Sequence, residues 1–172
     1  MAAVLSPLSP PPQPVVDAQA FRGAMGCFAT GITIVTAVDA DGRWVGLTAN
    51  SFNSVSLSPA LVLWSLASRS GSMAAFRQAT HYAINVLAAD QQALAERFAA
   101  RLSDRFAGIA HRPGLHGCPL IQGAAAVFEC RSRSRHEEGD HVIFVGEVQR
   151  CTHRPDAAPL VYHQGRYVLP RD

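Results

Sequence analysis

The stretch Trp44–Ala67, WVGLTANSFNSVSLSPALVLWSLA, carries the clearest structural pattern in this chain. Short apolar runs alternate with polar turns and a proline, which is typical of strands joined by tight connections, and we expect strands at 44–48 and 60–66. Thr, Asn and Ser side chains gather in the turns, where hydroxyls, amides and free backbone N–H groups suit an anionic, oxygen-rich ligand. An ordinary hairpin corner has the same composition, because these residues form turns in any protein.

The rest of the chain alternates β-rich runs with short amphipathic segments. We expect further strands at 32–38, 81–87, 124–135, 141–151, 160–162 and 166–169, and helices at 18–28, 72–78 and 91–100. Asp17 and Asp90 are the expected N-caps of the first and third helices. Residues 103–123 show no periodicity and are expected to form a long loop. These elements predict a mainly β fold with a few helices, arranged as an antiparallel barrel.

Composition limits the possible classes of protein. The length of 172 residues suits one domain, predicted at 17–172 after a Pro-rich arm at 1–16 that we expect to be disordered. Only 16% of the residues are charged against 48% hydrophobic, which indicates a surface partly covered by a second copy of the chain. The net charge of +2 is too small to predict a nucleic-acid partner.

The cysteines and the apolar runs bear on the compartment. The four cysteines, at positions 27, 118, 130 and 151, form no C-x-x-C motif and no cluster with histidine, so we expect reduced, mostly buried thiols and no metal site. No apolar run reaches the ~18 residues of a membrane span. Prolines interrupt the N-terminal apolar residues, which argues against a secretion signal. We therefore expect a cytoplasmic protein with no membrane partner. The sequence also lacks the glycine-rich motifs of Rossmann and P-loop nucleotide sites.

Several motifs, taken in order, resemble the flavin reductase family. They are FATGITIVT (28–36), GLTANSF (46–52), SVSLSP (54–59), DRFAG (104–108), GDH (139–141) and YHQGRY (162–167). The resemblance covers about residues 20 to 169 and implies an FMN-binding split β-barrel, assembled as a homodimer with the flavin at or near the interface. It also implies reduction of free, exchangeable FMN or FAD by NADH, with NADPH possible. The reduced flavin would pass to a separate monooxygenase, often one acting on aromatic substrates.

The resemblance also implies where the cofactor would bind. In that family, the turn after one strand and the segment at the end of the next hold the flavin. The cofactor-binding candidates here are Thr30, Thr48, Ala49, Asn50, Ser51, Ser54, Ser65, Leu66, Ala67, Ser70 and Ser72. Among them, Ser51, Ser70 and Ser72 are candidates for the phosphate. Ser72 also begins an expected helix, so plain N-capping is an alternative role for it.

Two further groups complete the candidate site. The resemblance places His141 against the nicotinamide or the flavin edge, with Asp140 orienting the imidazole or the turn; a turn histidine without function is the alternative. We assign neither residue an obligatory acid or base role, because the cofactors carry the hydride chemistry. Tyr162, Arg166 and Tyr167 could contact the adenine or the pyrophosphate of a dinucleotide, or could simply close a final hairpin.

Other interpretations stay open at this point. The arginines at 131, 133 and 135 share one face of a strand and could form a solvated edge or contact a dinucleotide phosphate. The chain could also bind flavin or haem without turnover, as a carrier or sensor. A third possibility is an obligate oxygenase subunit, with the 103–123 loop and the N-terminal arm as docking surfaces.

Overall fold

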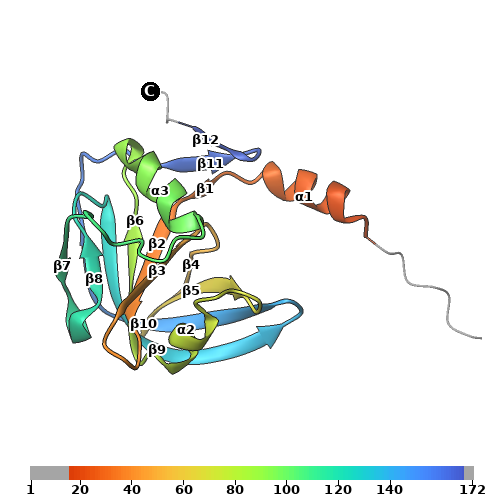
Figure 1. Cartoon of the computed structure of the whole chain (residues 1–172). Coiled ribbons are helices and arrows are strands. Elements are labelled where there is room, and N and C mark those ends of the chain that lie inside the picture. Colours follow the sequence, from red (N-terminus) through yellow and green to blue (C-terminus); the bar gives the residue numbers. More distant parts are fainter. Residues whose placement is uncertain (1–15, 169–172) are drawn as a thin grey trace, which may run out of the picture.

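A seven-stranded antiparallel sheet forms the body of the protein (Figure 1). The computed structural model describes residues 16–168. Along the sheet the strands are β3 (Trp44–Ala49), β2 (Thr33–Val38), β6 (His81–Val86), β9 (Ala126–Glu138), β10 (His141–His153), β5 (Ala60–Ala67) and β4 (Asn53–Leu57). Each neighbouring pair in this order is antiparallel. The expected mainly β, antiparallel fold is therefore confirmed.

Smaller elements surround this sheet. The helices are α1 (Ala18–Gly26), α2 (Met73–Gln78) and α3 (Gln92–Ala99), with single 3₁₀ turns at η1 (Ala89–Gln91) and η2 (Leu115–Gly117). Strands β1 (Thr30–Gly31), β11 (Val161–His163) and β12 (Arg166–Val168) form a three-stranded sheet, and β7 (His111–Pro113) pairs with β8 (Pro119–Ile121). The helices and longer strands lie where the sequence indicates, with ends shifted by a few residues.

Two expectations about local structure are wrong and one is confirmed. Residues 103–123 are not a plain loop, because they contain the β7–β8 hairpin, whose three-residue strands are too short to show a period. Asp90 does not cap α3, because it lies inside η1. The capping bond at the start of η1 comes from the Gln91 side chain, which accepts from the Ala88 N–H at 3.0 Å. Asp17 does cap α1, since its carboxylate accepts from the Ala20 N–H at 2.7 Å.

An aromatic cluster fills the core beneath β5. Val62, Trp64 and Leu66 are buried on one side of this strand, because successive side chains of a strand point to opposite faces. The Trp64 side chain is fully buried, stacks on Phe144 with ring centroids 4.7 Å apart, and meets the Phe76 ring edge-on at 5.0 Å. Because α2 supplies Phe76 and β10 supplies Phe144, this cluster holds three elements together. The same elements form one side of the cleft described below.

A buried carboxylate, paired with a half-exposed arginine, fastens the β7–β8 hairpin to the sheet. The Glu129 carboxylate on β9 is 4% exposed, lies 2.7 Å from Nε of Arg150, and accepts from the Leu115 N–H at 2.6 Å. Gly114 is required beside it, since a Cβ there would lie 2.4 Å from the Glu129 carboxylate. A charged side chain thus satisfies the backbone of the hairpin turn.

Several apolar side chains remain on the surface. Helix α1 has no buried residue and projects away from the sheet in Figure 1. Its Phe21 and Met25 side chains are 57% and 54% exposed, and Leu57 on the edge strand β4 is 94% exposed. Exposed apolar groups of this size on a helix and on a sheet edge are unusual for a fully solvated surface.

The remaining expectations concern the burial of the cysteines, membrane-spanning helices and metal sites. All four cysteines are free, but only Cys118 and Cys130 are buried, so the expectation of mostly buried thiols fails for Cys27 and Cys151. Burial raises the pKa of the Cys118 thiol to about 11 and that of Cys130 to about 12. No helix within residues 16–168 has the length and apolar character needed to cross a membrane. Over the same residues, no three His, Cys, Asp or Glu side chains gather in a group that could hold a metal ion.

Candidate functional site

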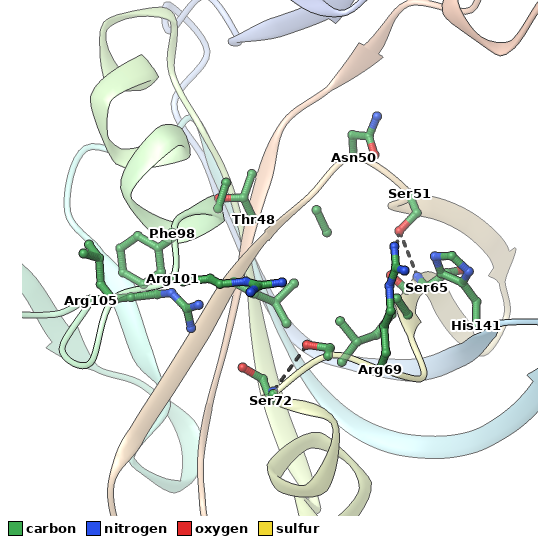
Figure 2. A pocket seen from close by; sticks show the side chains of 18 residues that line it. Thr48, Asn50, Ser51, Ser65, Arg69, Ser72, Phe98, Arg101, Arg105 and His141 are labelled. Atoms are coloured by element: carbon green, nitrogen blue, oxygen red, sulfur yellow. Dashed lines mark hydrogen bonds between the residues drawn. The ribbon is translucent and has the colours of Figure 1, made fainter. Parts of the chain in front are cut away.

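A cleft of about 950 Å³ opens between the ends of β3 and β5, the loop before α2, and the end of α3 (Figure 2). Its lining consists of residues 47–51, 65–67, 69–72, Phe98, Ala99, Arg101, Leu102, Arg105 and His141. Ten of the residues predicted for the site lie here, namely Thr48, Ala49, Asn50, Ser51, Ser65, Leu66, Ala67, Ser70, Ser72 and His141. Segments far apart in the sequence thus meet around one cleft.

Ser51 joins two walls of the cleft. Its hydroxyl accepts from the Ser65 N–H at 2.9 Å and donates to the Ser65 carbonyl at 3.1 Å. This pair of bonds links the turn after β3 to β5, although these strands are not neighbours in the sheet. The Asn50 side chain beside it is exposed. Hydrogen bonds between the Ser51 hydroxyl and the Ser65 backbone therefore hold the cleft in shape, and the exposed Asn50 amide is available to a ligand.

The third wall is built by α3 packing closely on β3. The Thr48 hydroxyl donates to the Ala95 carbonyl at 2.6 Å, which ties the strand to the helix. Gly46 permits the close approach, because a Cβ there would lie only 2.8 Å from the Phe98 ring. An apolar ring and the apolar residues of β3 thus lie opposite the polar turn.

The serine loop before α2 leaves one hydroxyl available. The Ser70 hydroxyl accepts from the Ser72 N–H at 3.3 Å, and the Ser70 N–H donates to the Ala67 carbonyl at 2.9 Å. The Ser72 side chain makes no capping hydrogen bond to α2, so the N-capping alternative for this residue is not observed.

His141 enters the cleft from the start of β10. Its Nδ1 lies 2.7 Å from the Asp140 carboxylate, and its backbone pairs in register with Ala67 on β5. The hydrogen bond and charge of His141, with a smaller effect from Arg69, hold the pKa of the Asp140 carboxyl below its usual range. Since Asp140 fixes Nδ1, the other ring nitrogen is the one left for a ligand. Asp140 itself does not line the cleft.

The remaining predicted residues lie around the cleft or outside it. Thr30 and Tyr162 line a neighbouring groove of about 560 Å³ that shares Asn50 and Ser51 with the cleft. The Tyr162 and Tyr167 rings meet edge-on at 5.3 Å, and burial raises the pKa of Tyr167. In the described part of the chain, Ser54 and Arg166 are exposed and line neither cavity.

The structure adds eight lining residues that sequence reasoning missed: Leu47, Arg69, Gly71, Phe98, Ala99, Arg101, Leu102 and Arg105. Among the missed arginines, Arg105 is the one that the sequence could have indicated, because it stands in the DRFAG motif (104–108). The lining contains three arginines and no carboxylate, so the cleft is positively charged. By contrast, two arginines of the β9 stripe, Arg131 and Arg133, pair with Glu147 at 2.8 and 3.3 Å.

A cleft in an antiparallel β fold that is lined by hydroxyls, apolar side chains and three arginines suits an anionic ligand that also has apolar surface. Residues 25–169 match the model of the flavin reductase like domain, and the chain belongs to that family. The resemblance in the motifs is therefore confirmed.

Curated relatives and solved structures agree with this assignment. The chain is 47% identical to the FMN reductase (NADH) SmoA of Agrobacterium fabrum over 88% of this chain and 85% of that one. It is 42% identical to the reductase component of the flavin-dependent trigonelline monooxygenase of Acinetobacter baylyi, over 87% of this chain but only 48% of that relative. The structure superimposes with a TM-score of 0.85 on an NADH:FAD oxidoreductase from Streptomyces globisporus, solved with NAD and FAD fragments, which is 36% identical over 92% of this chain and 97% of that one.

Proposed function

We propose that this protein is an NAD(P)H:flavin oxidoreductase that reduces free FMN or FAD and supplies the reduced flavin to a separate monooxygenase, one acting on aromatic substrates. The observation that carries the proposal is the cleft in which the flavin-binding positions of the family motifs converge with three arginines and His141. The relatives named as flavin reductases and as a monooxygenase reductase component support it.

The cleft residues fit a flavin in size and chemistry. Its volume of about 950 Å³ suits a ligand of that size, and its walls offer both apolar surface and hydrogen-bonding groups. Leu66 and Phe98 supply apolar surface for a ring, while the exposed Asn50 amide and the backbone of 65–67 can bond its polar edge. When bound, the flavin accepts the hydride in its own ring system.

His141 and Asp140 position the hydride donor in this proposal. The imidazole lies on the same side of the cleft as Ser51 (Figure 2), and its side chain is 47% exposed. A nicotinamide entering from solvent meets this ring and is held beside the flavin, which is the geometry that hydride transfer needs. A cleft that remains accessible also allows the reduced flavin to leave.

The test is oxidation of NADH by the purified protein with excess FMN and then FAD, followed by the loss of NADH absorbance in the near ultraviolet. We expect flavin-dependent turnover that saturates with both substrates, and NADPH in place of NADH ranks the two donors. Flavin binding without oxidation of either nucleotide would contradict the proposal and favour the carrier or sensor alternative.

We also propose that the chain is a homodimer and works in the cytoplasm. The exposed Phe21 and Met25 on α1 and Leu57 on β4 support a covering partner, and the groove that Met25 and Phe28 help to line extends to Asn50 and Ser51 of the cleft. A second copy seated there would lie near the flavin. Four free cysteines support a reducing compartment.

The dimer can be tested by light scattering after size exclusion. We expect a mass near twice 18.4 kDa for the wild type and a shift toward the monomer for Phe21→Glu and Leu57→Asp, because each change places a charge in an apolar contact. Gln19→Glu, on the same helix as Phe21, adds a charge beside that contact and should leave the dimer intact. A monomeric wild type would refute the proposal.

A further inference from the structure

Two histidine rings stack where the β7–β8 hairpin meets the main sheet. His81 begins β6, and His116 lies in η2, between the two strands of the hairpin. Their ring centroids are 3.6 Å apart, and the ring planes are 14° from parallel. The backbone of His116 is left-handed, with φ 53° and ψ 27°, a conformation that most residues avoid. The two rings form a histidine pair that joins the sheet to a turn with an unfavourable backbone conformation.

The second strand of the hairpin, β8, is held by hydrogen bonds that do not depend on pH near neutrality. The Thr36 hydroxyl donates to the Pro119 carbonyl at 2.6 Å. The Asn85 side chain accepts from the Ile121 N–H at 2.9 Å. Hydroxyl and amide groups do not titrate between about pH 5 and 8, whereas histidine does. Acid therefore acts on the turn that carries His116 and not on β8.

The charged groups around the histidine pair leave it without a compensating carboxylate. Those that flank His81 in the register of β9 and β10 are Glu129, Arg131, Arg133, Glu147 and Arg150. Both carboxylates in this set are paired with its arginines, at 2.7 to 3.3 Å. On the hairpin side, burial raises the pKa of the Cys118 thiol to about 11, so this group stays neutral. Within residues 16–168, the His81 ring makes a hydrogen bond only with the Thr80 hydroxyl, at 3.0 Å.

This arrangement does not accommodate a second positive charge. Burial, followed by the charges of His116 and Arg131, holds the pKa of His81 below its usual range. A neutral imidazole still stacks with a charged one, but two charged rings at 3.6 Å repel each other. Separation of the rings relieves this repulsion and returns His81 to its ordinary pKa of about 6.5. Opening is therefore favoured as the pH falls through that value, because the open form binds more protons.

The first strand of the hairpin, β7, reaches the cleft through aromatic side chains. The His111 ring on β7 meets the Trp44 ring edge-on at 4.4 Å and the Phe106 ring at 5.7 Å. Phe106 meets Phe98 edge-on at 5.0 Å, and Phe98 lines the cleft. A hairpin that leaves the sheet withdraws His111 from these rings, so the α3 wall of the cleft loses part of its support.

We infer that the histidine pair is an acid-sensitive contact that opens the turn and β7 at about pH 5.5, and that this opening competes with ligand binding in the cleft. The opening follows from the stacked rings alone, whereas its effect on flavin rests on the proposed function. Opening and flavin binding are linked in both directions, so acid weakens flavin binding and bound flavin keeps the hairpin closed.

The test is hydrogen exchange of the 111–121 backbone at about pH 7.5 and about pH 5.5, followed by mass spectrometry and corrected for the intrinsic effect of pH on exchange. In the wild type, the equilibrium constant for opening should rise by about 10-fold at the lower pH, the limit for one proton that only the open form binds. His116→Phe and His81→Phe each keep a ring in the stack but remove one titrating group, so the rise should disappear in both. His136→Phe changes an exposed histidine near the tip of the β9–β10 hairpin and should behave as the wild type.

Flavin provides a second measurement on the same samples. Saturating FMN should lower the opening constant of the wild type at about pH 5.5, because the closed hairpin supports the Phe98 wall. An acid response of equal size in the wild type and in both phenylalanine variants would overturn the inference and point to another group, such as His111. The absence of any acid response in the wild type would overturn it as well. An opening constant that FMN does not change would refute the link to the cleft, while NADH oxidation by the same wild-type sample decides the proposed function separately.

Discussion

Replacing His141 with alanine is expected to lower kcat/KM for NADH by about 10²-fold while the Kd for flavin stays unchanged. The imidazole is fixed at the cleft wall by the 2.7 Å contact between its Nδ1 and Asp140, and by the pairing of its backbone with Ala67. Without the ring, the nicotinamide keeps its access but loses the surface that aligns it, and small misplacements slow hydride transfer steeply. Steady-state kinetics with varied NADH at saturating flavin measures the effect.

Two variants sharpen this experiment. Asp140→Asn retains an oxygen that can accept from Nδ1 but removes the charge, so we expect a smaller loss than in His141→Ala. His136→Ala removes an exposed histidine of the same hairpin and should leave the kinetics unchanged. In the described residues its side chain makes a hydrogen bond only with the Ser134 hydroxyl. If flavin binding falls as much as kcat/KM in His141→Ala, the histidine contacts the flavin and not the nicotinamide.

The longer strands were predictable because they are apolar runs bounded by turn residues. β5 is apolar at every position but Ser65, and only the folded chain shows that its buried and partly exposed positions alternate. The β7–β8 hairpin was missed because three residues are too few for a period, and its turn depends on the distant Glu129 carboxylate. Helix α1 shows the opposite case. Its apolar spacing predicts a buried face, yet none of its residues is buried within the described chain.

The candidate site was predictable only in part, for a related reason. The turn at 48–51 and the segment at 65–67 were recognised through the family motifs, and the Ser51–Ser65 hydrogen bonds show why they must lie together. Arg69 and Arg101 carry no local signal, since arginine is common on any surface and only the folded chain shows which ones face a cleft. Arg105 stands in a recognised motif, but its bonds to Gly46 and Ala100 could not be inferred from spacing.

The core beneath the cleft leads to the largest expected effect on stability. Trp64→Ala should reduce the free energy of unfolding by about 3–5 kcal/mol, the usual cost of removing a large aromatic side chain from a packed core. Trp64 is fully buried and contacts rings from α2 and β10, so the neighbouring elements cannot close the cavity without moving. Urea denaturation followed by far-ultraviolet circular dichroism gives the free energy directly.

Matched variants separate this packing effect from the loss of any tryptophan. Trp44 is 52% exposed, so Trp44→Ala should cost no more than about 1 kcal/mol. Trp64→Phe keeps a ring in the core and removes an indole N–H that is buried without a partner in the described structure, so its loss should be smaller than that of alanine. Ser65 follows Trp64 on β5 and bonds Ser51 across the cleft, so a displaced strand should also weaken flavin binding in Trp64→Ala. Equal losses for the two alanine variants would contradict the view that the core beneath β5 supports the cleft.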